Sequence, residues 1–121
     1  IYGLERVNLQ NRLYIVEGPI DSLFIDNCLA AAGADLQLPV EKKDVVFIFD
    51  NEPRNKQIID RMYNVIDKDY ELVIWPEGQV EKDINDMIMN GKSKSDIQKI
   101  ISENTYSGLS ALTQLNSYKR C

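Results

Sequence analysis

Histidine is absent from this sequence and cysteine is nearly so. The 121 residues include no histidine and two cysteines, Cys28 and the terminal Cys121. This composition excludes a disulfide framework, a zinc ribbon and any catalytic device built on a Ser/His or Cys/His pair. If the chain carries out chemistry, carboxylates must do it.

A long hydrophobic run is also missing. No stretch approaches the roughly 20 consecutive apolar residues of a membrane span, and residues 1–6 do not resemble a signal peptide. We therefore expect a soluble, intracellular domain with no membrane partner. Nineteen acids against fourteen bases give a net charge of -5, which argues against nucleic-acid binding by bulk positive potential but leaves a local acidic metal site open.

The composition suits one globular unit, with 44% hydrophobic and 27% charged residues and no repeat or low-complexity tract. We expect a single domain over residues 1–121, with its core at about 13–105 and a helix or extended arm over 106–121. Because the chain opens with Ile1 rather than methionine, we expect it to be excised from a longer protein whose upstream domains are missing.

Three short apolar runs predict β-strands, at Leu13–Val16, Val45–Phe49 and Leu72–Trp75. Their continuous hydrophobicity is typical of strands buried on both faces of a parallel sheet. Residues 36–40 are a candidate for a further short strand.

Helical patterns lie between and after these runs, and helices alternating with strands indicate an α/β fold with a mainly parallel sheet of about four strands. The predicted helices cover Ile20 to Ala31 with Cys28 inside, 58–66, Ile84 to Ile88, and a segment through Ile101 capped by Ser93 or Ser95. In the tail, Leu109, Leu112 and Leu115 are the candidate apolar positions.

Acidic side chains follow each predicted strand. They are Glu17 after the first strand, Asp50 and Glu52 after the second, and Asp83 and Asp86, with Asn85 between them, after the third. Ligands of open parallel sheets bind outside the carboxyl ends of the strands, so we expect these side chains to converge there. Clustered carboxylates repel one another unless a cation neutralises them, and oxygen-only ligands favour Mg²⁺ or Mn²⁺.

These motifs resemble a known family. The segments 13–21 (Leu-Tyr-Ile-Val-Glu-Gly-Pro-Ile-Asp), 47–52 (Phe-Ile-Phe-Asp-Asn-Glu) and 82–85 (Lys-Asp-Ile-Asn) are similar to the Toprim domain of bacterial-type primases, topoisomerases and some nucleases. The resemblance covers residues 13 to 91 and implies a Rossmann-like fold. Segments 2–5, 17–22 and 104–109 look most like primases of T-even-type bacteriophages.

The resemblance implies roles for the acids. Glu17 takes the place of the Toprim glutamate, and Asp50 and Glu52 that of its Asp-x-Asp pair, with a longer side chain at the second position. These three are the expected catalytic residues, and together with Asp83 they are the expected metal ligands. Asp21 and Asn85 match accessory positions, although Asn85 is neutral where the family has an acid.

The function implied is that of the catalytic domain of a DNA primase. It would make short RNA primers on single-stranded DNA from ribonucleoside triphosphates by Mg²⁺- or Mn²⁺-dependent nucleotidyl transfer, beside a replicative helicase in the cytoplasm of the bacterial host. Whether Glu17 binds metal or deprotonates the attacking hydroxyl stays open, as does activity of the fragment alone. The alternatives are a Toprim nuclease or topoisomerase fragment, and a receiver-like α/β module, which would need a lysine after a fifth strand that the sequence does not show.

Several of these residues also have structural interpretations. Any one strand-end acid can be a turn or helix cap, which applies most to Asp21, and Asp86 fits a solvated first helical turn. Trp75 is typical of core packing, with base stacking as the alternative. Arg54 and Lys56 fit either a solvated helix face or contacts to phosphate or nucleic acid.

Overall fold

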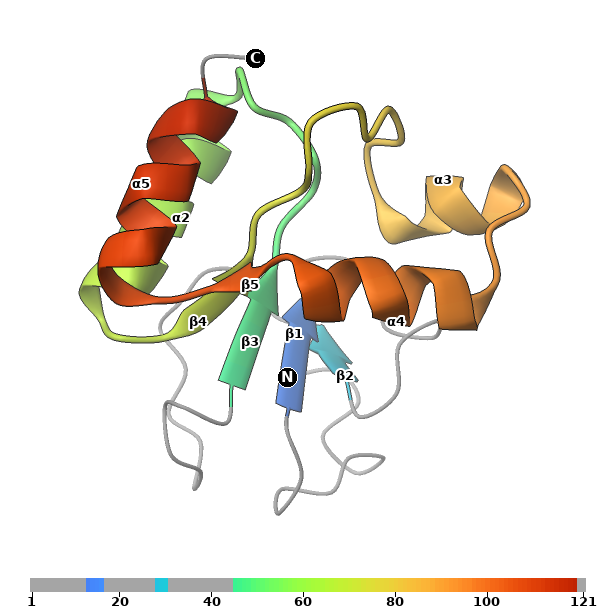
Figure 1. Ribbon diagram of the computed structural model, residues 1–121, viewed down its shortest axis with the longest axis horizontal. Coiled ribbons are helices and arrows are strands. Elements are labelled where there is room, and N and C mark those ends of the chain that lie inside the picture. The colour runs from blue at the N-terminus through green and yellow to red at the C-terminus, as the bar shows by residue number, and fades with distance from the viewer. Residues whose placement is uncertain (1–12, 17–27, 31–44, 120–121) are drawn as a thin grey trace.

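The computed structural model describes residues 13–16, 28–30 and 45–119, with side chains for the first and last ranges. A five-stranded sheet in the order β2-β1-β3-β4-β5 forms its centre (Figure 1). The strands are β1 (Leu13–Val16), β2 (Cys28–Ala30), β3 (Val45–Ile48), β4 (Glu71–Val73) and β5 (Thr105–Tyr106). The first four run parallel and β5 is antiparallel to β4, which confirms the α/β fold and its mainly parallel sheet.

The central strands are buried, as their continuous hydrophobicity predicts. All four residues of β3 are inaccessible, and it pairs with β1 and β4 through Ile15↔Phe47 and Phe47↔Leu72. The Phe47 ring packs edge-on against Tyr70 at 5.1 Å between ring centroids. A strand covered on both faces in this way holds the residue that follows it in a fixed place.

Strand β2 corrects the prediction that Cys28 lies inside a helix. Residues Cys28–Ala30 instead pair in parallel with β1, in the register Tyr14↔Cys28. Helical spacing and a short apolar run cannot be told apart over so few residues, and pairing with β1 satisfies the backbone of this segment. The predicted helix start at Ile20 and the candidate strand at 36–40 lie outside the described residues.

Four helices follow the predicted patterns. They are α2 (Lys56–Asp67), α3 (Ile84–Met89), α4 (Lys94–Glu103) and α5 (Gly108–Tyr118). Asn55 caps α2 by accepting hydrogen bonds from the backbone of Gln57 and Ile58, and Ser93 caps α4 in a reciprocal capping box with Asp96. Figure 1 shows α5 beside α2, where the Tyr63 hydroxyl donates to Asn116 Oδ1 at 2.7 Å. No helix within the described ranges has the length and apolarity to cross a membrane.

Helix α5 buries one of its three leucines. Ala111, Leu115 and Tyr118 lie in the core, whereas Leu109 is 80% exposed and Leu112 is also exposed. The buried positions follow the i, i+4, i+7 spacing of one helical face, and contact with α2 and β5 selects that face. Of the three candidate apolar positions in this tail, only Leu115 is buried.

Candidate functional site

Asp50 lies where the chain leaves β3, at the carboxyl end of the sheet. Phe49 before it is buried, and Asp50 itself is half-buried. Its neighbours in a narrow hollow include Val16 at the end of β1, Asp83 and Ile84. The structure thus brings Asp50 and Asp83 together at the edge where parallel sheets bind ligands.

Glu52 faces a lysine that the sequence reasoning did not single out. Lys82 Nζ lies 3.2 Å from Glu52 Oε1, and Asn55 Nδ2 donates to the other oxygen of Glu52 at 2.8 Å. The hydrogen bond from Asn55, followed by the one from Lys82, holds the pKa of Glu52 below its ordinary value. The ammonium of Lys82 offsets part of the carboxylate repulsion predicted here. In the sequence, the position of Lys82 directly before Asp83 was the only indication of this role.

Lys82 interacts electrostatically with all three acids that the structure describes at this edge. The hydrogen bond and the charge of Glu52 raise the pKa of Lys82, and the charges of Asp50 and Asp83 raise it further. Lys82 is thus a positive charge among acids that would otherwise repel one another. We call Asp50, Glu52, Lys82 and Asp83 the acidic edge.

Asp83 has a structural role in addition to its place in the hollow. It is the N-cap of α3, and its Oδ1 accepts a hydrogen bond from the backbone N–H of Asp86 at 2.8 Å. Asp86 is an exposed first-turn acid, as expected. Asn85 is half-buried on α3 and is not one of the residues that line the hollow.

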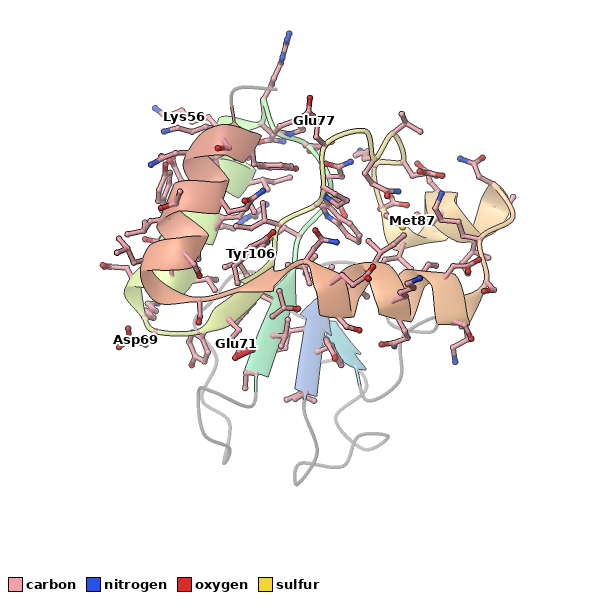
Figure 2. All side chains as sticks on the ribbon, in the orientation of Figure 1. Lys56, Asp69, Glu71, Glu77, Met87 and Tyr106 are labelled. Carbon is pink, nitrogen blue, oxygen red and sulfur yellow. The ribbon has the colours of Figure 1, made fainter. Side chains whose placement is uncertain are left out.

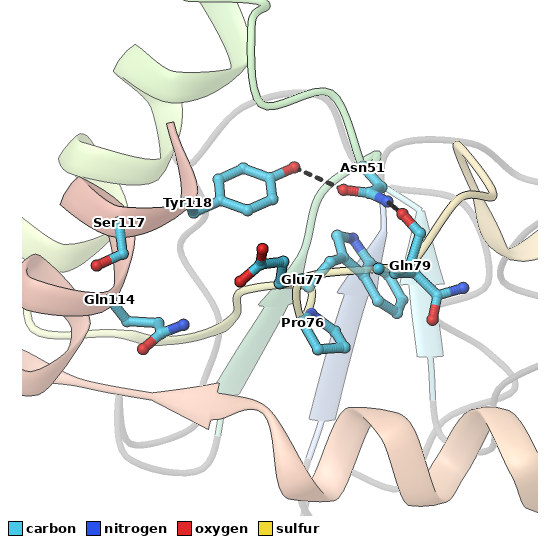
Figure 3. A pocket seen from close by; sticks show the side chains of 9 residues that line it. Asn51, Pro76, Glu77, Gln79, Gln114, Ser117 and Tyr118 are labelled. Atoms are coloured by element: carbon cyan, nitrogen blue, oxygen red, sulfur yellow. Dashed lines mark hydrogen bonds between the residues drawn. The ribbon is translucent and has the colours of Figure 1, made fainter. Parts of the chain in front are cut away.

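Asn51, between the two acids of the β3–α2 connection, is anchored on several sides. Its Nδ2 donates to the carbonyls of Gln79 at 2.7 Å and Glu81 at 3.1 Å, and its backbone N–H donates to the carbonyl of Lys82. The hydroxyl of Tyr118, at the end of α5, donates to Asn51 Oδ1 at 2.9 Å (Figure 3). These bonds fix the two segments of the acidic edge, 50–52 and 82–83, relative to each other and to α5.

Glu81 is the buried anchor of the segment that carries Lys82. It is 7% exposed, and its carboxylate accepts hydrogen bonds from Lys92 Nζ at 2.9 Å and Gln79 Nε2 at 2.7 Å. The bond from Lys92 is the main cause that holds the pKa of Glu81 below its ordinary value. A buried carboxylate satisfied in this way fixes the loop before α3.

Asp50 and Asp83 are the candidate metal ligands among the described acids, because both line one hollow. Mg²⁺ typically takes only one or two carboxylates and keeps several waters. Within the described ranges no group of three or more His, Cys, Asp or Glu side chains could hold a metal ion. Glu17 and Asp21 lie outside those ranges, so the full predicted ligand set stays a prediction.

The remaining candidates lie around the acidic edge. Arg54 and Lys56 are exposed on the β3–α2 connection, and Figure 2 shows Lys56 at the start of α2, at the same end of the molecule as Glu77. Trp75 is 2% exposed and donates from Nε1 to the carbonyl of Phe49 at 2.8 Å. The packing interpretation of Trp75 is therefore confirmed, and phosphate contact by the two cations stays a prediction.

Comparison with known proteins shows that this α/β chain is similar in sequence to a DNA primase. It is 39% identical over 124 aligned residues to a protein named DNA primase from Enterobacteria phage T4. The alignment covers 99% of this chain and 36% of the phage protein, so the chain spans about a third of the length of that relative. No family model matches. The identity supports a relationship to a phage DNA primase.

Proposed function

We propose that this chain is the catalytic Toprim domain of a DNA primase, which makes short RNA primers on single-stranded DNA from ribonucleoside triphosphates in the cytoplasm of a bacterial host. The placement of Asp50 and Asp83 in one hollow at the carboxyl end of a parallel sheet carries the proposal. The similarity to a phage primase over nearly the whole chain supports it. A replicative helicase is the proposed partner.

The residues of the acidic edge would have different roles, in metal binding and in charge balance. Asp50 and Asp83, with Glu52 and Glu17, would hold Mg²⁺ or Mn²⁺, which when bound stabilises negative charge on a reacting phosphate. Lys82 balances the acids and lies where it can also meet a phosphate oxygen. Arg54 and Lys56 would contact template or triphosphate from the rim, where attraction is screened by salt.

Two alternatives remain distinct from primer synthesis. A Toprim nuclease would use the same acids to cut phosphodiesters, so only the reaction separates it from a primase. A receiver-like module is disfavoured, because β5 is antiparallel and is followed by Ser107 and Gly108 rather than by lysine.

The test is to incubate the intact protein with single-stranded DNA, ribonucleoside triphosphates and Mg²⁺. We expect RNA primers from the parent and none from Asp50→Asn, which keeps the shape of the side chain and removes its charge. Asp60→Asn is the matched control, because Asp60 is an exposed acid on α2 and the change is identical. Cut DNA in place of primers would favour the nuclease, and normal primer yield from Asp50→Asn would refute the role of Asp50.

A further inference from the structure

A pocket of about 130 Å³ lies beside the acidic edge, between the end of α5 and the loop after β4. Figure 3 shows its lining side chains. Its wall at residues 76–79 is a tight turn, closed by the N–H of Gln79 donating to the carbonyl of Pro76 at 3.2 Å. Gly78 adopts φ +91°, which this turn requires at its third position. The turn presents Glu77 at the pocket.

The lining combines apolar side chains with two polar groups. Trp75, Pro76 and the ring of Tyr118 supply the apolar part, with Trp75 2% and Tyr118 6% exposed. Glu77 on the turn and Gln114 on α5 approach from opposite sides in Figure 3, and neither side chain has a hydrogen-bond partner among the described residues. The lining residues include no lysine or arginine.

This chemistry selects a planar, neutral heterocycle rather than an anion. Phosphate would meet the carboxylate of Glu77 with no cation to balance it. A carboxylate accepts from adjacent N–H groups, and the amide of Gln114 can donate to a carbonyl. The edge of guanine carries both features, with two neighbouring N–H donors and one carbonyl, whereas uracil offers a single N–H donor.

The pocket is also placed to share a ligand with the acidic edge. Trp75 lines both this pocket and the hollow that contains Asp50 and Asp83, and Asn51, which follows Asp50 directly, lines the pocket. A nucleotide whose base entered the pocket would direct its phosphates toward the acids. We infer that the pocket binds the base of a ribonucleotide and prefers guanine; the direction of the phosphates rests on the proposed function.

Trp75 is the sole tryptophan of the sequence, so its fluorescence reports on this pocket. The 121-residue chain is titrated without metal with guanosine monophosphate, uridine monophosphate and ribose 5-phosphate. We expect a saturable change with the guanosine nucleotide, binding of the uridine nucleotide at least about threefold weaker, and no change with ribose 5-phosphate. A lost hydrogen bond corresponds to roughly a three- to tenfold loss of affinity, which we expect for Gln114→Ala and for Glu77→Gln.

The matched control is Gln98→Ala, the same change on α4, which should bind guanosine monophosphate as the parent does. The inference is overturned if the guanosine nucleotide gives no saturable change, if ribose 5-phosphate or the uridine nucleotide binds as well, or if Gln114→Ala and Glu77→Gln match the control. Failure of the proposed function would give a different result: primer synthesis would survive Asp50→Asn while base binding stayed intact.

Discussion

Two glutamate–lysine ion pairs that meet at residues 81 and 82 differ in how far they are exposed to solvent. Glu52 and Lys82 lie 3.2 Å apart with side chains 28% and 57% exposed, whereas Glu81 and Lys92 lie 2.9 Å apart with side chains 5% and 32% exposed. Lys82 directly follows Glu81. One short segment therefore carries a solvated pair at the site and a buried pair beneath it.

The difference in exposure suits the two pairs to different roles, one anchoring a loop and the other exchanging its cation. Exposed ion pairs contribute little to stability and are easily replaced by other partners, whereas a buried carboxylate left without its cation is costly. The Glu81 pair therefore fixes the loop, and we propose that the Glu52 pair can exchange its ammonium for a divalent cation.

The largest expected effect is the response to magnesium. Saturation of the acidic edge at about 100 times the dissociation constant would stabilise the fold by about 2.7 kcal/mol, enough to raise the melting temperature by several degrees. Asp50→Asn should blunt that rise, and it should stabilise the metal-free chain only slightly because Lys82 already offsets part of the repulsion. Melting curves with and without Mg²⁺ measure both, with Asp60→Asn as the control. A parent chain that ignores millimolar Mg²⁺ and Mn²⁺ would contradict the metal site.

The second prediction compares the two lysines. Lys92→Met leaves the buried carboxylate of Glu81 without its cation and should lower the free energy of unfolding by about 2 kcal/mol, less than for a fully buried pair because Lys92 is partly exposed. Lys82→Met should leave the melting temperature unchanged within error and enlarge the rise caused by Mg²⁺. Equal destabilisation by both variants would show that the two pairs do not differ.

The third prediction concerns the bond between Tyr118 and Asn51. Tyr118→Phe removes one hydrogen bond and should cost about 1 kcal/mol, and it should also reduce the Mg²⁺ response because Asn51 positions Asp50 and Glu52. Tyr63→Phe is the matched control, since it removes a tyrosine–asparagine bond to Asn116 on the exposed surface. A Mg²⁺ response that both variants lower equally, or that neither changes, would mean that Tyr118 has no positioning role.

The smallest effect is the dependence of stability on acid. The pKa of Glu81 is lower in the folded protein than its ordinary value of about 4.5, so its ion pair stabilises the fold above that pH and is lost as the pH falls through the folded pKa. Denaturant unfolding of Glu81→Gln should show a shallower loss of stability below about pH 4.5 than the parent. Parallel curves for parent and variant would exclude Glu81 as the titrating group.

Local patterns predicted the parts of the fold that local interactions determine. The apolar stripe of α2 and the cap of α4 at Ser93 depend on residues within a few positions of one another. Strand β2 depends on pairing with β1, and the buried face of α5 depends on what packs against it, so neither was visible.

The same contrast holds for the candidate site. The position of Asp50 could be predicted, because the end of a parallel strand fixes where it lies, whereas Asp83 is placed by the N-terminus of α3. Tyr118 and Asn51 are 67 residues apart in sequence, and no short pattern indicates that they touch. The segment 82–85 was singled out for Asp83 and Asn85, and no role was assigned to Lys82, whose ammonium lies 3.2 Å from Glu52.

The antiparallel strand β5 has a consequence for solubility. An open strand edge is a template on which a second molecule can add its own strand and begin an aggregate. Here β5 consists of Thr105 and Tyr106 alone, with α4 ending at Glu103 and α5 beginning at Gly108. Only two residues of backbone are offered at this side of the sheet, too few to start a polymer, so the molecule is protected there against edge-to-edge association.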